Sequence, residues 1–488
     1  MSPDDMAWEQ SEVTSDNWLV QFLERDIMRP IADFVLKHNS GHATEFATLK
    51  KGSFNISLRM KYRKEAIVIR FAQPGAVFFP EEKVSNEVAV MRFIVDQTAV
   101  PVPFVLHSGT KQESPLELSP FFMMDFVEHE TKMYNALNTP DCPGEQRGTL
   151  DPNIDESRLE MLYGEMGDIL LRLFTLSLPR IGSLTQVDDF SWEVARRPLS
   201  MNMNELIRLG ESADDCRRKF VARRLFRKLA REKRLTNPPF ENGPFKMWCD
   251  DLRPANVLLN ERMKIVGVVD WKFTYAAPVE FSLAPPWWLL IEQPESWPNG
   301  IDDWTKEFDR RLKTFLKAMR GCEDATIQHG RLKTDQRLSG HMQQSWDSGD
   351  FWIMYAALHS FAFDAIYWQK IDPRFFESPN SPTDAWKERL NLLDAQEKDE
   401  MEQLVAQKMY EMNNRALSWD PDDYTVGYRQ QLKRKIEEAK KAKAAADNAT
   451  KTEKKIMTGE EFEARTDEGK IPPTDTISDS LATTHLSN

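Results

Sequence analysis

Residues 249–259 of this 488-residue chain read CDDLRPANVLL, and residues 265–271 read IVGVVDW. Asn256 follows Asp251 by five positions, and two short apolar runs around a polar turn predict a β-hairpin that ends at Asp270. Kinases use such residues for phosphoryl transfer: one Asp orients the attacking hydroxyl and accepts its proton, while an Asn and a second Asp hold a metal ion at the phosphates. Carboxylate and amide oxygens are the ligands that Mg²⁺ prefers. The pattern therefore predicts Asp251 as a catalytic residue and Asn256 and Asp270 as metal ligands.

A simpler explanation for Asp251 and Asn256 is a turn or a helix cap, because Asp and Asn are frequent in both. Because the hairpin adds a second carboxylate, Asp270, to this pair, the phosphoryl-transfer site is favoured over a simple turn or cap. Cys249 is interpreted as a small buried residue and not as a nucleophile, since no base partner is evident for it.

The segments before this motif predict a small sheet with one inserted helix. Alternating and β-branched runs predict strands near 54–60, 66–71 and 120–127. Apolar residues at helical spacing predict helices over 16–37 and 82–96, with Pro30 as the candidate position for a kink or a split in the first.

From about residue 155 onward the pattern becomes mainly helical, with one long helical signal over 346–370. Residues 429–447 are a charged helix former, and the basic run within them favours a solvated helix over a nucleic-acid patch. Residues 448–488 are polar without a core pattern, which predicts disorder.

Composition disfavours several classes of protein. The net charge of −13 argues against general binding to nucleic acid or to an anionic membrane. Four cysteines without a CxxC pair, and no HExxH motif, argue against a zinc site or a disulfide framework. No apolar run approaches the ~18 residues of a membrane span. The acidic start MSPDDMAWEQ is unlike a signal peptide or a transit peptide, so we expect a cytoplasmic protein and leave the mitochondrion open.

The motifs together resemble the aminoglycoside phosphotransferase and choline-kinase superfamily, and they look closest to its fungal branch. The family pattern is HGDLHPGN followed by IDW, and similar text includes KGSFN, AIVIRF, SNEVAVMRFI and APVEFSLAPPWWLL. The resemblance implies a two-lobed, protein-kinase-like α+β fold with a small β-rich N-lobe, a mostly helical C-lobe and a disordered C-terminal tail. We expect an N-terminal helix and nucleotide-binding lobe over 1–127, a large lobe with the catalytic loop over 128–425, and a charged helix and tail over 426–488.

The resemblance also implies a nucleotide site with ATP and Mg²⁺ as cofactors. A cation in the strand AIVIRF would hold the phosphates, a glutamate in SNEVAVM would pair with it, a loop at KGSFN would cover the phosphates, and a hinge at 124–127 would bind adenine. The first three have simpler alternatives: the cation could be an exposed strand charge, the glutamate a solvated helix residue, and the loop an ordinary hairpin turn. The cofactor-binding residues implied are Arg70, Glu87, Gly52, Ser53, Met124 and Phe126.

The chain departs from the family pattern at several positions, while the Asp/Asn/Asp core is intact. Cys249 and Asp250 stand for the usual His and Gly, Arg253 and Ala255 for a second His and Gly, and Lys272 for a frequent Glu. The expected function is an ATP- and Mg²⁺-dependent kinase acting on a small-molecule hydroxyl. The alternative, motivated by Cys249-Asp250 and by an Arg at position 70, is a pseudokinase-like nucleotide-binding or scaffold protein.

The acceptor is expected beside Asp251, because attack must come from the side opposite the departing nucleoside diphosphate. Its walls are expected to be Trp271–Trp288 and the helix signal at 346–368. On that signal Asp350 and Asp364 share a stripe with apolar residues, which would suit a cationic acceptor, although such a stripe is also typical of a core. The sequence names neither the acceptor nor an oligomeric state.

Overall fold

The computed structural model describes most of the chain between residues 6 and 414, together with isolated residues from 427 to 441. The chain divides into two units, 1–416 and 417–488, and the account below concerns the first. The predicted tail 448–488 lies outside the described residues, as does most of the predicted charged helix. The undescribed residues within the first unit are 1–5, 40, 141, 143–146, 205–211, 236–239, 378–383 and 415–416.

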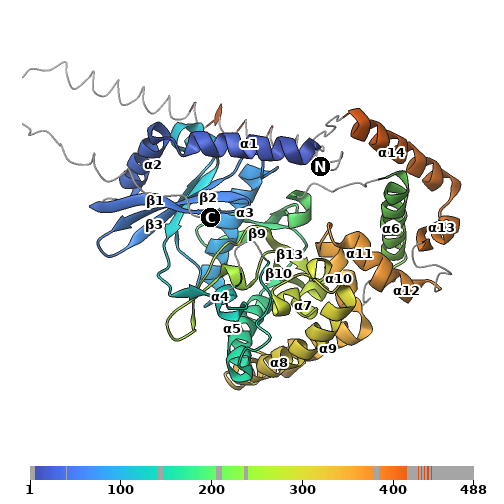
Figure 1. The fold of residues 1–488 in the computed structure, drawn as a ribbon. Helices are drawn as coiled ribbons and strands as arrows, with labels where there is room; N and C mark the ends of the chain where they lie inside the picture. The colour runs from blue at the N-terminus through green and yellow to red at the C-terminus, as the bar shows by residue number, and fades with distance from the viewer. Residues whose placement is uncertain are drawn as a thin grey trace, which may run out of the picture. The chain divides into compact units, whose positions relative to one another are not determined.

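The N-terminal region is built on a five-stranded antiparallel sheet with the strand order β1-β2-β3-β5-β4 (Figure 1). β-branched and aromatic residues dominate the central strands, as expected for a sheet that is buried on both faces. The strands are β1 (Ala43–Lys51), β2 (Asn55–Tyr62), β3 (Ala66–Ala72), β4 (Val105–Gly109) and β5 (Phe121–Asp125).

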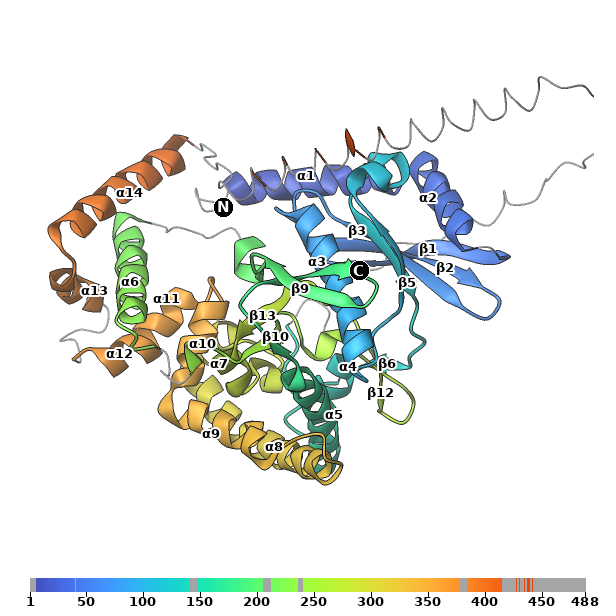
Figure 2. The same ribbon diagram turned by 180° about the vertical axis from the view of Figure 1, so that it is seen from behind.

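Helices cover both faces of this sheet. One face packs against α1 (Met6–Phe22) and α2 (Arg25–His38), which lie along the sheet in both views (Figures 1 and 2). The other face packs against α3 (Pro80–Gln97). The predicted helical structure over 16–37 is confirmed, but the break between α1 and α2 lies at residues 23–24 and not at Pro30, which lies inside α2.

Strand alternation decides where Arg70 points. Successive side chains of a strand face opposite sides of the sheet. Ile69 and Phe71 of β3 belong to the core under α1 and α2, while Val68 and Ala72 belong to the core under α3. The side chain of Arg70 therefore lies on the α3 face.

The C-terminal region is mainly helical, around one apolar core. α5 and α8 pack together, and α6 and α14 lie side by side in both views, joined by the ion pair of Arg217 with Glu402 (Figures 1 and 2). The longer helices are α5 (Glu156–Thr175), α6 (Ala213–Arg231), α8 (Ile301–Gln328), α9 (Leu338–Ser348), α10 (Asp350–Leu358) and α14 (Ala395–Asn414). The short ones are α4 (Met133–Leu137), α7 (Val279–Leu283), α11 (Phe363–Ile366), α12 (Asp372–Phe375) and α13 (Ala385–Arg389).

Among the described residues of this region, three small sheets accompany the helices. The predicted hairpin is confirmed as β11 (Val257–Leu259) and β12 (Ile265–Val268), and β6 (Thr131–Lys132) adds a third strand to it. A second sheet has the strand order β13-β10-β7, and β8 and β9 form a separate hairpin. Their strands are β7 (Ser177–Leu178), β10 (Phe245–Cys249), β13 (Thr274–Pro278), β8 (Ser183–Asp188) and β9 (Ser191–Arg196).

The long helix predicted over 346–370 is wrong. Gly349 adopts a left-handed conformation, with φ +79°, and separates α9 from α10. The chain breaks again after Leu358, before α11 and a π-helical turn at Tyr367–Ile371. Asp350 and Asp364 therefore lie on different helices and share no stripe.

The fold is a two-lobed, kinase-like α+β arrangement with a β-rich N-terminal region and a helical C-terminal region, as predicted (Figure 1). Many aromatic residues of the helical region are core residues: Trp304, for example, is fully buried and stacks on Phe308. Among the described residues, no helix combines the length and the apolar character that crossing a membrane would need.

Candidate active site

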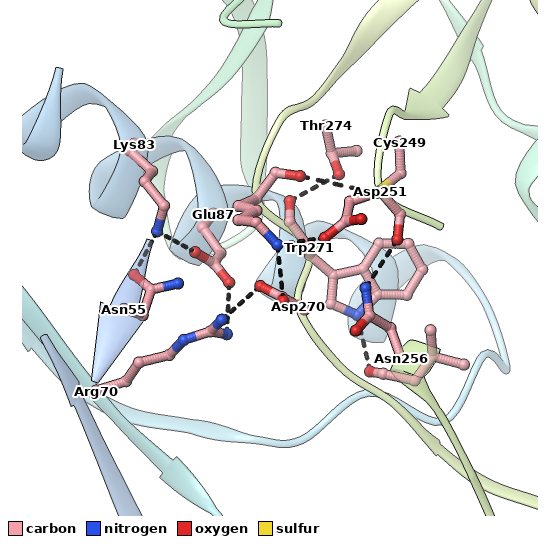
Figure 3. A network of polar contacts seen from close by, with 12 residues as sticks. Asn55, Arg70, Lys83, Glu87, Cys249, Asp251, Asn256, Asp270, Trp271 and Thr274 are labelled. Atoms are coloured by element: carbon pink, nitrogen blue, oxygen red, sulfur yellow. Dashed lines mark hydrogen bonds and ion pairs between the residues drawn. The ribbon is translucent and has the colours of Figure 1, made fainter. Parts of the chain in front are cut away.

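The loop after β10 is closed by its own side chains (Figure 3). Asn256 donates from Nδ2 to the backbone carbonyl of Asp251 over 2.8 Å, which ties the two ends of the loop. Arg253 donates from Nε to Oδ1 of Asp251, also over 2.8 Å. The carbonyl of Asn256 accepts from the backbone N–H of Val269, so the loop is fixed to the hairpin that delivers Asp270.

Asp270 stands just after β12 in a left-handed backbone conformation with φ +70°. Such a conformation is uncommon for a residue other than glycine, although Asp adopts it more readily than most. The turn is held by Trp271, whose side chain is almost fully buried and donates from Nε1 to the carbonyl of Val268 over 2.9 Å. Thr274 in turn donates to the carbonyl of Trp271.

Arg70 connects the N-terminal sheet to this turn (Figure 3). One of its guanidinium nitrogens pairs with Glu87 of α3 at 3.1 Å, and the other pairs with Oδ1 of Asp270. Although burial works in the opposite direction, Arg70 and Lys272 hold the pKa of Asp270 well below its usual range. Four of the predicted site residues, Arg70, Glu87, Asp251 and Asp270, thus meet in one network, since Lys272 joins Asp251 to it.

Lys272 lies between the two carboxylates. Its ammonium donates to Oδ2 of Asp251 and, over 2.7 Å, to Oδ2 of Asp270. The side chain is only 4% exposed. Burial disfavours the charge, but the carboxylates of Asp270 and Asp251 raise the pKa of the Lys272 ammonium above its ordinary value, so it stays protonated.

Lys83 belongs to the network and was not predicted. It lies one helical turn before Glu87 on α3 and pairs with Oε2 of that residue at 3.2 Å. It also donates to Oδ1 of Asn55 over 2.7 Å, which joins α3 to the end of the β1–β2 loop. Burial lowers the pKa of Lys83 to about 8. The spacing of four residues on a predicted helix was the available signal.

The unusual Cys249-Asp250 pair has a structural role. Oδ1 of Asp250 accepts from Trp248 Nε1 over 2.8 Å and from the Tyr275 hydroxyl over 3.1 Å, and Oδ2 accepts from the backbone N–H of Met201 over 2.8 Å. Burial raises the pKa of Asp250 to about 7. Cys249 is buried, and burial raises the pKa of its thiol to about 12, which agrees with a small core residue and not a nucleophile.

Asn256 belongs to the network through its bond to the carbonyl of Asp251, whereas the other four predicted site residues lie outside it. Gly52 donates its backbone N–H to the carbonyl of Asn55 over 2.8 Å, within the β1–β2 turn, and Ser53 is exposed beside it. Met124 is buried in β5 opposite Val68, and the ring of Phe126 lies 5.3 Å from the Arg59 guanidinium carbon. The nucleotide contacts of these four residues stay predictions.

The sequence model of the phosphotransferase enzyme family matches residues 56–322, more than half of the chain. The chain belongs to this family. The matched segment contains the whole network around Asp251 and Asp270 except Asn55. No curated protein sequence matches the chain.

Solved structures of phosphotransferases are also similar. The crystal structure of aminoglycoside phosphotransferase APH(4)-Ia has 12% sequence identity and a TM-score of 0.35, over 70% of this chain and 98% of that one. Macrolide 2′-phosphotransferase type I has 13% identity and a TM-score of 0.36, over 73% of this chain and 99% of that one.

A metal ion of the kind expected for a phosphotransferase does not fit this network as it stands. Asn256 and Asp270 offer oxygen atoms, which Mg²⁺ prefers. However, each carboxylate oxygen of Asp270 already contacts a cation, from Arg70 or from Lys272. The described residues contain no cluster of three or more acidic, His or Cys side chains arranged to bind a metal. The cations of the network, Arg70, Lys83, Arg253 and Lys272, outnumber its carboxylates, Glu87, Asp251 and Asp270.

A narrow apolar cavity lies next to the loop that carries Asp251. The space within it that the centre of a water molecule can occupy is about 60 Å³. Asp250 and Leu252, which flank Asp251 in sequence, line it together with Trp287, as do Phe281, Tyr355 and His359. The part of the predicted acceptor wall around Trp287 therefore borders a cavity beside this loop.

The predicted acidic stripe for a cationic acceptor is wrong. Asp350 pairs with Arg374 at 2.8 Å, and Asp364 pairs with Arg223 at 2.7 Å. Neither acid lines the cavity beside the loop. Both charges are neutralised by arginines, so neither is available to balance the charge of an amine.

Proposed function

We propose that the chain is an ATP-dependent kinase that phosphorylates a hydroxyl group of a small molecule. The observation that carries the proposal is the pairing of Arg70 with both Glu87 and Asp270, next to Asp251. In the proposal, Arg70 is a buried cation that binds the phosphates, supported by a helix glutamate, and Asp251 is the carboxylate that accepts a proton. Kinases use the same combination. Membership of the phosphotransferase family supports it independently.

In the proposed reaction the acceptor hydroxyl donates a hydrogen bond to the carboxylate of Asp251. Its oxygen attacks the γ-phosphorus of ATP, a new O–P bond forms, and the bond between this phosphorus and the β–γ bridging oxygen breaks. The hydroxyl proton passes to Asp251, and the bridging oxygen leaves with ADP. Arg70 and Lys272 lie where they can balance the charge of the phosphates, which is how such sites lower the barrier.

We propose the apolar cavity bordered by Trp287 and Leu252 as the place of the acceptor's non-reacting part. Its lining is mainly aromatic and aliphatic. A slender apolar group attached to the alcohol would fit it, whereas the paired acids Asp350 and Asp364 give no support for an amine.

A pseudokinase-like nucleotide-binding or scaffold protein is the second candidate. One observation favours it: both carboxylate oxygens of Asp251 are already engaged, Oδ1 by Arg253 and Oδ2 by Lys272. An acceptor hydroxyl has to share one of these oxygens or displace a donor. Binding of ATP without turnover of any alcohol would favour this candidate.

Substitution of Asp251 by Asn tests the proposed function. The change keeps the shape of the side chain but removes the proton acceptor, so turnover of ATP with a small-molecule alcohol library should fall about 100-fold or more. Nucleotide binding, measured by calorimetry, should persist. Asp335→Asn, at an exposed position, is the control and should keep full turnover. Unchanged turnover in Asp251→Asn would remove Asp251 from the mechanism.

The sequence predicts Mg²⁺ at Asn256 and Asp270, but the cations paired with Asp270 argue against that ion. The lobe boundary near residue 127, the likeness to the fungal branch and a cytoplasmic location stay predictions.

A further inference from the structure

The position of Lys272 is the starting point. The residue lies between β12 and β13, two positions after Asp270, and its ammonium touches one oxygen of Asp251 and one of Asp270. The ring of Phe54, from the β1–β2 loop, covers it at 5.5 Å from the ammonium nitrogen to the ring centroid. The ammonium of Lys272 thus contacts both Asp251, the proposed proton acceptor, and Asp270, the carboxylate proposed to lie near the phosphates. The ring of Phe54 lies over it.

Burying an ammonium group is costly unless carboxylates compensate it. Here two carboxylates do so, and Arg70 occupies the other oxygen of Asp270. A divalent ion bound by Asp270 would have to displace one of these cations or lie against them. Each of these arrangements costs Coulomb energy at distances of a few ångströms.

Both oxygens of Asp270 are therefore held by cations, one by Arg70 and the other by Lys272. Two cations at one carboxylate suit an incoming polyphosphate better than a metal ion that arrives alone.

We propose that the Lys272 ammonium supplies the positive charge that a metal ion bound between Asp251 and Asp270 would otherwise supply, so that the chain binds the phosphates of ATP without needing a divalent cation. The inference rests on the proposed function, since it concerns the same nucleotide site. Lys272 then lies beside the phosphates of the bound nucleotide, and the affinity for the nucleotide depends only weakly on Mg²⁺.

Nucleotide binding by the unmodified chain is the first test. The dissociation constants of ADP and of the ATP analogue AMP-PNP are measured by calorimetry with excess Mg²⁺ and again with EDTA. We expect them to differ by less than about threefold, which is under 1 kcal/mol. A loss of about tenfold or more in EDTA would overturn the inference and leave the proposed function standing. No binding in either buffer would remove the proposed function and the inference with it.

Lys272→Met is the second test, because Met keeps most of the length of the side chain and removes its charge. We expect nucleotide binding in EDTA to weaken about tenfold or more and Mg²⁺ to restore it. We also expect Mn²⁺ binding without nucleotide, followed by electron paramagnetic resonance, to appear in the variant and to be absent from the unmodified chain.

Lys264→Gln is the matched control, because it removes one positive charge from the turn of the neighbouring β11–β12 hairpin, where Lys264 is 57% exposed and pairs with Glu165. It should behave as the unmodified chain does. If Lys272→Met bound nucleotide in EDTA as tightly as the unmodified chain or more tightly, Lys272 would block the phosphate site, and the inference would be wrong.

Discussion

Asp250 shows how one side chain can shape the loop without taking part in the chemistry. It replaces a glycine of the family pattern, and its three hydrogen bonds join β10, β13 and the segment at Met201. Because burial raises its pKa to about 7, it holds a proton in the folded chain at pH values where the unfolded chain has lost it. The folded state therefore binds more protons between about pH 4 and pH 7, and this residue makes stability fall as the pH rises through that window.

Asp250→Asn should remove this pH dependence. Asn still accepts from Trp248 and Tyr275, but it loses the bond from Met201, which costs a roughly constant amount of about 1 kcal/mol. Relative to the unmodified chain, the variant should therefore gain stability between about pH 5 and pH 7, by up to about 1.4 kcal/mol per pH unit. Denaturant unfolding at several pH values measures the difference. A difference that stays constant with pH would contradict the raised pKa.

The sequence predicted which residues lie near one another where one motif contained both partners, and failed where the partners come from distant segments. Asp251, Asn256 and Asp270 lie on one loop and one hairpin, so their local spacing predicted that they lie close together, while their roles stay predictions. The contacts of Arg70 with Asp270, and of Lys272 with Asp251, depend on how the sheet meets the hairpin. Lys272 was recognised as a departure from the pattern, but its bridging position was not predictable from spacing.

At the scale of elements, the region from residue 338 to 371 departs most from prediction. An apolar pattern continuous enough to suggest one helix is divided into α9, α10 and α11. Gly349 provides the first break, since its positive φ is easily adopted by glycine. The hairpin of β8 and β9 was not predicted either, because its burial is partial and its apolar alternation is weak.

Two glycines in this region should respond to alanine in opposite directions. Gly349→Ala forces a side chain into a left-handed conformation and should destabilise the fold by about 1–2 kcal/mol. Gly340→Ala lies within α9, where an added Cβ meets nothing within 4 Å, and should stabilise it by about 0.5–1 kcal/mol. Thermal unfolding of both variants measures the two shifts. If the melting temperature changed equally and in the same direction in both variants, the helix break assigned to Gly349 would be contradicted.

At the scale of the molecule, the active-site network joins the sheet to the large lobe through few contacts. Arg70 reaches from β3 to Asp270, and Phe54 reaches from the β1–β2 loop to Phe273, with ring centroids 5.4 Å apart. A nucleotide bound at Arg70 would add contacts to the same junction. Ligand binding to the folded state alone raises its stability by mass action.

AMP-PNP at about 100 times its dissociation constant should therefore stabilise the chain by about 2.7 kcal/mol and raise its melting temperature by several degrees. Arg70→Met removes the phosphate cation and should abolish most of this rise. Differential scanning fluorimetry with and without the analogue gives both values. An equal rise in Arg70→Met would place the nucleotide elsewhere.

The helix α3 is held from two sides. Glu87 and Lys83 connect it to the sheet and its loop, while Glu82 forms a paired contact with Arg197, with bonds of 2.8 and 3.2 Å, just after the β8–β9 hairpin. Arg92 of the same helix donates to Gln186 of β8 over 3.0 Å. A regulatory partner that switched this protein by swinging α3 outward would first have to break these contacts on the large-lobe side. Control of activity through that helix would thus require a tightly binding effector, or a modification placed directly on the hairpin.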